Sequence, residues 1–131
     1  SDEIKYLNES NDDLSDDIKN LPNDTGGIYV FYIKGLNLSF IENYILYIGR
    51  CQFTETQHIR KRAREYYKDT RDLIVEMFSR WKEHLYYRYY PDTNNERIKN
   101  NEIQLIRAIL PQYNEVIPDQ VDIQDSVPAF E

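Results

Sequence analysis

Two runs of apolar and aromatic residues dominate the hydrophobic pattern and predict a pair of strands. Residues 27–34 and 44–49 are almost continuously apolar or aromatic, which is typical of strands covered on both faces. A turn signal follows the first run, and residues 38–41 are expected to extend the hairpin. A third, tyrosine-rich run over residues 84–90 ends at Pro91 and completes a predicted antiparallel sheet.

Helical patterns occupy the rest of the central region. Thr54 and Gln57 have capping-box spacing, which predicts a helix from about residue 56. Residues 71–82 predict another helix, and a second capping box at Thr93 opens one that Pro111 ends. These elements predict an α+β fold: a small three-stranded antiparallel sheet flanked by helices.

The length of 131 residues predicts one compact domain over residues 25–114. Residues 1–24 read as an acidic N-terminal extension, with a short helical pattern around Leu14 and Ile18. Residues 115–131 form an acidic C-terminal extension, interpreted as an edge strand or a loosely packed segment.

The formal net charge of −7 argues against a protein that holds nucleic acid by bulk electrostatics. Positive charge is nevertheless in excess between residues 50 and 88, directly after the second strand. Taken alone, such a run is more simply explained as a solvated helix face. We therefore expect modest affinity for nucleic acid and a further DNA-binding domain or subunit.

The chain has no apolar run of the roughly 20 residues that a membrane helix needs, so we expect no membrane partner. A lone cysteine, Cys51, cannot form an internal disulfide and is interpreted as a small packed residue. Both features favour a cytoplasmic location.

Glu102 interrupts an apolar helix face. Ile98, Leu105, Ile106 and Ile109 define the stripe, and Glu102 falls in its middle at 100° per residue. A carboxylate in this position must be paired, protonated or bound to a metal. Helical geometry leaves two explanations equally open: a structural one, which is a buried ion pair or a stripe that is open at that point, and a functional carboxylate.

Four further polar residues have weaker individual signals. Arg62 and Tyr66 are four residues apart and project from the same side of their helix. Tyr29 and Tyr47 lie on adjacent strands, so their hydroxyls can converge on one face. Taken singly, a basic surface residue and buried structural tyrosines are the simpler interpretations.

Asn114 follows the turn Pro111-Gln112-Tyr113. Its amide could anchor a loop, orient a phosphate or orient Tyr29, and an ordinary turn asparagine is the simplest alternative.

The order of these elements resembles the GIY-YIG endonuclease family. Gly27-Ile28-Tyr29 and Tyr47-Ile48-Gly49 match its two motifs, and residues 59–63 look like its catalytic arginine helix. Residues 102–106 with 111–114 are similar to its glutamate helix and closing asparagine. The pattern is most similar to the N-terminal nuclease domain of bacterial excision-repair endonucleases, in which Arg50 and Tyr66 also have counterparts.

The resemblance implies a DNA endonuclease domain that leaves a 5′-phosphate and a 3′-hydroxyl, in DNA repair or a related process. Glu102 would hold one Mg²⁺ or Mn²⁺. Arg62 would stabilise the transition state, and Tyr29 would act on the attacking water with a pKa lowered by nearby positive charge. Tyr47 would position water or phosphate.

The resemblance further implies that Arg50, Tyr66 and Asn114 bind substrate. It leaves two other functions open. A catalytically silent module that keeps the fold for binding or assembly agrees with the acidic balance. A nuclease directed at RNA or at branched nucleic acid is the third.

Overall fold

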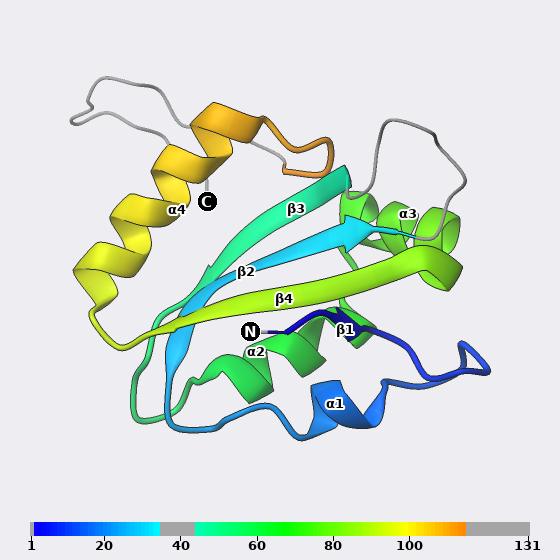
Figure 1. Ribbon diagram of the computed structural model, residues 1–131, viewed down its shortest axis with the longest axis horizontal. Coiled ribbons are helices and arrows are strands. Elements are labelled where there is room, and N and C mark those ends of the chain that lie inside the picture. The colour runs from blue at the N-terminus through cyan, green and yellow to red at the C-terminus, as the bar shows by residue number, and fades with distance from the viewer. Residues whose placement is uncertain (1, 35–43, 115–131) are drawn as a thin grey trace.

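The computed structural model describes residues 2–34 and 44–114, in which helices cover both faces of one antiparallel sheet (Figure 1). The strand order is β1-β4-β2-β3. The strands, in chain order, are β1 Ile4–Lys5, β2 Gly26–Ile33, β3 Tyr44–Cys51 and β4 Leu85–Asp92. The helices are α1 Asp16–Lys19, α2 Ile59–Glu65, α3 Asp72–Trp81 and α4 Asn95–Ile109, with 3-10 turns η1 Tyr66–Lys68 and η2 Lys82–His84.

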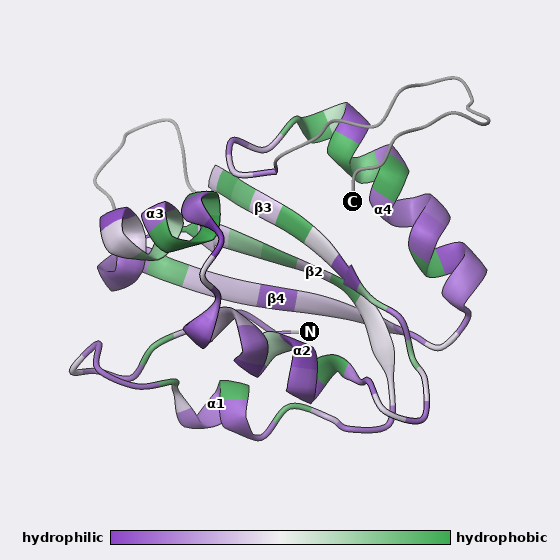
Figure 2. Cartoon of the chain, turned by 180° about the vertical axis from the view of Figure 1, so that it is seen from behind, coloured by the Kyte–Doolittle hydropathy of each residue, from purple (hydrophilic) through white to green (hydrophobic). Residues whose placement is uncertain are grey.

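Strand β2 is buried along its whole length, because each of its faces meets a separate hydrophobic cluster. Alternate side chains on a strand point to opposite faces. Tyr29 and Phe31 pack with α2 and α3, whereas Ile28 and Val30 pack under α4. Figure 2 shows hydrophobic residues along β2 and β3 and towards the C-terminal end of α4. The continuous apolar run is thus explained by cover on both sides.

The sheet has four strands, so the prediction of three was one short. Residues 4–5 of the acidic N-terminal segment form β1, which pairs antiparallel with residues 86–87 of β4. The sequence pattern did not predict this strand, because only two residues pair and the neighbouring residues are acidic. The predicted helical pattern nearby appears as the single turn α1, which Ser15 caps and which buries Ile18.

Two predicted helix starts were wrong by one to three residues. Helix α2 begins at Ile59, because the Nδ1 atom of His58 accepts the backbone N–H of Lys61 at 3.3 Å. Helix α4 is capped by Asn94 rather than Thr93, and its side chain accepts from the N–H of Arg97 at 3.0 Å. Several polar residues near each start compete for the cap, and the tertiary fold selects one.

Strand β4 continues past Pro91, where the sequence predicted it to stop. Pro91 lies opposite Gly27 of β2, beyond the point where β1 pairs with β4. Proline is tolerated there because its missing N–H faces no partner strand.

The expected hairpin extension at residues 38–41 and the C-terminal extension lie outside the described residues. Among the residues that are described, no helix is both long and apolar enough to cross a bilayer.

Candidate active site

The backbone geometry explains why glycine stands in each of the two tripeptides, Gly27-Ile28-Tyr29 and Tyr47-Ile48-Gly49. Gly27 has a φ of +143°, a conformation that side chains rarely adopt, and a Cβ there would overlap the backbone of Tyr90. Gly49 lies opposite Tyr29 in the β2–β3 register. A Cβ on Gly49 would lie 2.6 Å from Cε1 of Tyr29, so only glycine lets the tyrosine ring lie across β3.

Helix α2 brings Arg62 to Tyr29 and Tyr66. The Nε atom of Arg62 donates to the Tyr29 hydroxyl at 3.2 Å, and Nη2 donates to the Tyr66 hydroxyl at 3.2 Å. The third nitrogen, Nη1, donates to Glu65 at 3.0 Å. The guanidinium is therefore held in one orientation, with about a third of the side chain still exposed.

Three tyrosine hydroxyls form a chain beside this arginine. Tyr29 and Tyr66 share a short hydrogen bond, and the Tyr66 hydroxyl donates to that of Tyr47 at 3.3 Å. Tyr66 joins two strands to α2, so the two strand tyrosines converge through it rather than directly. The structure thus brings together Tyr29, Tyr47, Arg62 and Tyr66.

The prediction of a lowered pKa for Tyr29 was wrong. Burial raises the pKa of Tyr29 well above its usual value, and the opposing effect of Arg62 is smaller. Burial likewise raises the pKa of Tyr66 and Tyr47. All three hydroxyls are consequently protonated at neutral pH, and each can donate a hydrogen bond.

The other arginines of α2 face away from the tyrosines. Arg60 donates from Nε to the carbonyl of Leu21 at 2.6 Å, and Arg64 donates to the carbonyl of Lys19. Residues 60 and 64 share one helix face, on the side of α1. Within this basic run, Arg62 is the arginine that reaches the hydroxyl chain.

Glu102 forms an ion pair with Arg50. The Nη1 atom of Arg50 lies 2.8 Å from Oε1 of Glu102, and the side chains are 29% and 13% exposed. This corresponds to the ion-pair alternative left open by the helical pattern. The pair joins β3 to α4 across the sheet face on which Ile98 and Ile106 are buried.

A surface hollow of about 240 Å³ connects the two halves of the site. Both Arg50 and Arg62 line it. The arginine that contacts Glu102 and the arginine that contacts the tyrosines therefore open onto the same space. Neutral side chains supply the rest of the lining: Cys51, Gln52, Thr54 and Gln57. Guanidinium groups bind anions, and each of these two is paired with a carboxylate, Arg50 with Glu102 and Arg62 with Glu65.

Asn114 binds the backbone of β3. Its Oδ1 accepts from the N–H of Ile48 at 3.0 Å, and its Nδ2 donates to the carbonyl of Ile48 at 2.8 Å. The adjacent Tyr113 N–H donates to the carbonyl of Leu46 at 2.9 Å. Both ends of the Asn114 amide are used in this way, so these bonds serve the anchoring role.

The described residues contain no group of three His, Cys, Asp or Glu side chains that could enclose a metal ion. Two carboxylates contact the arginines of the site, Glu102 at Arg50 and Glu65 at Arg62, and Glu102 is partly exposed. Mg²⁺ commonly binds through one or two carboxylates and keeps several waters that substrate phosphate can replace. The donor set fits one such ion held jointly with a substrate.

Arg71 was missed by the sequence reasoning. Its Cζ atom lies 5.7 Å from the centroid of the Tyr66 ring, and that of Arg62 lies 5.0 Å away. Arg71 directly precedes α3. The sequence shows only that Arg71 follows Tyr66 by five residues. The turn between η1 and α3 is what places Arg71 beside the Tyr66 ring.

Comparison with known proteins gives a consistent result for the fold alone. No family model and no curated protein matches the sequence. The structure is similar to the GIY-YIG N-terminal endonuclease domain of UvrC from Thermotoga maritima bound to magnesium. The TM-score is 0.56 and the identity 20%, over 82% of this chain and 99% of that chain. A point variant of the same domain gives a TM-score of 0.55 and 17% identity, over 84% and 100% of the two chains.

The match spans 82% of this chain and 99% of the UvrC domain. The protein therefore has the α+β fold of a GIY-YIG endonuclease domain.

Proposed function

We propose that this protein is a metal-dependent endonuclease that hydrolyses a DNA phosphodiester to a 5′-phosphate and a 3′-hydroxyl. The observation that supports the proposal is a hollow lined by both Arg62, which donates to the tyrosine hydroxyls, and Arg50, which pairs with Glu102. The fold agrees, because a UvrC domain of this fold is an endonuclease domain that binds magnesium as its catalytic cation.

Arg62 would stabilise charge on the phosphate in the transition state. Tyr29 and Tyr66 hold its guanidinium in place before substrate arrives. Little reorganisation is then needed as charge develops, which is the main source of electrostatic catalysis. Its partial exposure leaves the side chain accessible to a phosphate entering the hollow.

Tyr29 would orient the attacking water. Because burial raises its pKa, the hydroxyl starts protonated and acts first through hydrogen bonds. Its hydroxyl is linked through that of Tyr66 to that of Tyr47 by hydrogen bonds. Tyr47 would position water or phosphate at the outer end of that chain.

Glu102 would hold the single Mg²⁺ or Mn²⁺, which when bound neutralises charge on the phosphate and its leaving oxygen. Arg50 occupies the carboxylate in the structure described here. We expect Arg50 to transfer to the incoming phosphate, because guanidinium binds phosphate and carboxylate with similar geometry. Arg50 and Tyr66 then remain substrate-binding residues, and Asn114 keeps β3 in register beside them.

DNA is the proposed substrate, in repair or a related process and in the cytoplasm. The net charge of −7 makes a further DNA-binding domain or subunit necessary for tight binding. The opposing interpretation is a catalytically silent module, which the Arg50–Glu102 pair favours because that pair already satisfies the carboxylate.

Nicking of supercoiled plasmid tests the proposal and separates it from the silent module. With Mg²⁺ or Mn²⁺ the protein should convert supercoiled to open-circular DNA, and EDTA should stop it. Arg62→Ala should lower the rate by about 10²–10³-fold, the usual effect of losing one charge-stabilising donor.

The matched control is Lys61→Ala, which removes an exposed charge from the same helix. Branched DNA and RNA substrates in parallel reactions would identify a different substrate preference. Absence of metal-dependent nicking, or equal rates for the Arg62 and Lys61 variants, would overturn the proposed function.

A further inference from the structure

We propose that Arg71 binds a second phosphate of the substrate strand, next to the phosphate at Arg62. The inference rests on the proposed function and extends it with a residue that neither the motifs nor the fold similarity assigns. It is carried by the position of Arg71 at the tyrosine cluster, by the way Asp69 holds it, and by its exposure.

Arg71 and Arg62 approach the same aromatic ring. Their Cζ atoms lie 5.7 Å and 5.0 Å from the centroid of Tyr66, both within the range of cation–π contact. The charge of Arg71 also acts against the rise in the pKa of Tyr47. The Tyr66 ring, in the middle of the hydroxyl chain, therefore has two guanidiniums beside it.

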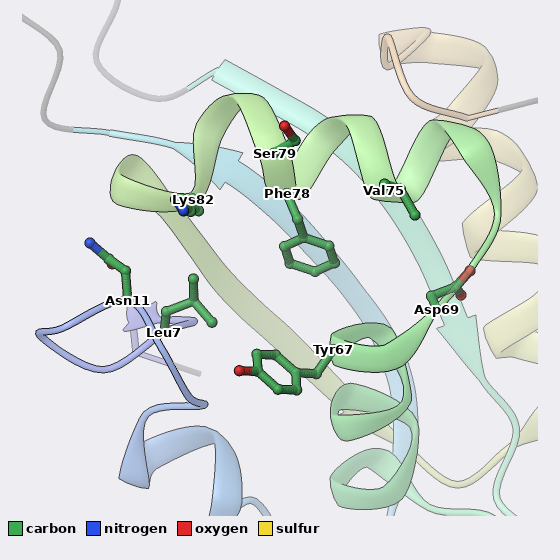
Figure 3. Close-up of a pocket in the computed structure, with 8 residues that line it drawn as sticks. All are labelled: Leu7, Asn11, Tyr67, Asp69, Val75, Phe78, Ser79 and Lys82. Carbon is green, nitrogen blue, oxygen red and sulfur yellow. The ribbon is translucent and has the colours of Figure 1, made fainter.

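The Asp69 carboxylate fixes the orientation of the Arg71 guanidinium. It accepts from Nε of Arg71 at 3.1 Å and from Nη2 at 2.8 Å, and it also accepts the Arg71 backbone N–H at 2.9 Å. Figure 3 shows Asp69 in the segment between η1 and α3, at the end of a pocket whose other wall is formed by the N-terminal residues Leu7 and Asn11. The Asp69 side chain is only 15% exposed.

These bonds use one edge of the guanidinium, which turns the Nη1 edge away from the carboxylate. The Arg71 side chain is 44% exposed, more than Arg62 at 31% or Arg50 at 29%. By contrast, Arg60 and Arg64 donate to backbone carbonyls of the N-terminal segment. Arg71 is thus held in a fixed orientation while remaining accessible to solvent.

A single strand of nucleic acid carries a phosphate at every residue, so a strand seated at Arg62 presents neighbouring phosphates on both sides. Arg50 lines the hollow together with Arg62, and Arg71 approaches the same Tyr66 ring as Arg62. The alternative is that Arg71 only forms a surface ion pair with Asp69. That would explain why the Arg71 side chain is exposed, but not why its guanidinium lies beside the Tyr66 ring.

The test compares Arg71→Ala with Arg80→Ala, which removes an exposed arginine of α3 that pairs with Glu76. Binding of a fluorescently labelled DNA duplex is measured by anisotropy in EDTA over a range of salt concentrations. Arg71→Ala should weaken binding by about tenfold and reduce the slope of log affinity against log salt by about one, the signature of one lost phosphate contact.

In the plasmid assay, Arg71→Ala should raise KM with little change in kcat. In the anisotropy measurement, Arg71→Lys should recover much of the slope of log affinity against log salt. Equal slopes for the wild type, Arg71→Ala and Arg80→Ala would overturn the inference while leaving the proposed function intact, provided that the wild type nicks plasmid. Failure of the wild type to bind or cut DNA would overturn both.

Discussion

Glu102 has a structural contact, and we propose a chemical role for the same carboxylate. It lies on a mostly apolar helix face, and the 2.8 Å contact with Arg50 offsets the cost of burying its charge. The same pairing would compete with the proposed metal, because both partners use the carboxylate oxygens. Arg50 therefore has two expected effects: it weakens metal binding without substrate, and it strengthens binding of phosphate.

Replacing Arg50 by glutamine should separate these effects. Without DNA, Arg50→Gln should bind Mn²⁺ more tightly, by up to about tenfold, or about 1.4 kcal/mol. Binding of duplex DNA should become weaker. Calorimetric titration with Mn²⁺ measures the first effect and fluorescence anisotropy the second.

The matched control is Arg97→Gln, which breaks an exposed ion pair with Asp92 at the start of α4. If Mn²⁺ affinity does not differ between the two variants, Glu102 is not the metal ligand.

Helix α2 depends on elements far from it in the sequence. The hydroxyl of Tyr6, which is fully buried, donates to the Ala63 carbonyl at 2.6 Å. Ala63 lies in the last turn of α2, where carbonyls have no partner within the helix. The N-terminal segment also accepts hydrogen bonds from Arg60 and Arg64. It thereby fixes the helix that presents Arg62.

Tyr6→Phe keeps the ring and removes this hydrogen bond. The Ala63 carbonyl is left unsatisfied, so we expect a loss of about 1–3 kcal/mol in the free energy of unfolding. If the contact also positions Arg62, the variant should show a lower kcat for nicking and a smaller change in KM. Both constants are measured under conditions in which the variant is fully folded.

Urea denaturation gives the stability and plasmid nicking gives the kinetics. Tyr44→Phe, at an exposed tyrosine of β3, is the control and should change neither. A Tyr6→Phe protein as stable as wild type would show that the hydrogen bond contributes nothing to folding.

Local patterns predicted the elements better than they predicted the contacts between them. The runs of β2 and β3 and the stripe of α4 follow from periodicity, and the fold class followed from those elements. The fourth strand and the Tyr6 contact did not, because they join residues separated by most of the domain. The choice of Arg50 as partner of Glu102 likewise depends on a register between β3 and α4 that no local pattern encodes.

At the scale of the whole molecule, the local arginines and the net charge have opposite expected effects on DNA binding. The net charge of −7 opposes approach to DNA, whereas Arg62 and Arg71 approach the Tyr66 ring and Arg50 lines a hollow with Arg62. A local cluster can bind a phosphate without making the whole surface attractive to DNA. We therefore expect the chemistry to be intrinsic to this chain and tight DNA binding to come from a partner.

The most direct test of the central claim is metal-dependent nicking by Glu102→Gln compared with the wild type. Glutamine keeps a similar shape and an acceptor for Arg50 but removes the negative charge that holds the cation. The wild type should nick plasmid as Mg²⁺ is added and leave a 5′-phosphate and a 3′-hydroxyl, while Glu102→Gln should be inactive with an unchanged unfolding midpoint. Nicking by Glu102→Gln at the wild-type rate would contradict the assignment of this carboxylate as the metal ligand.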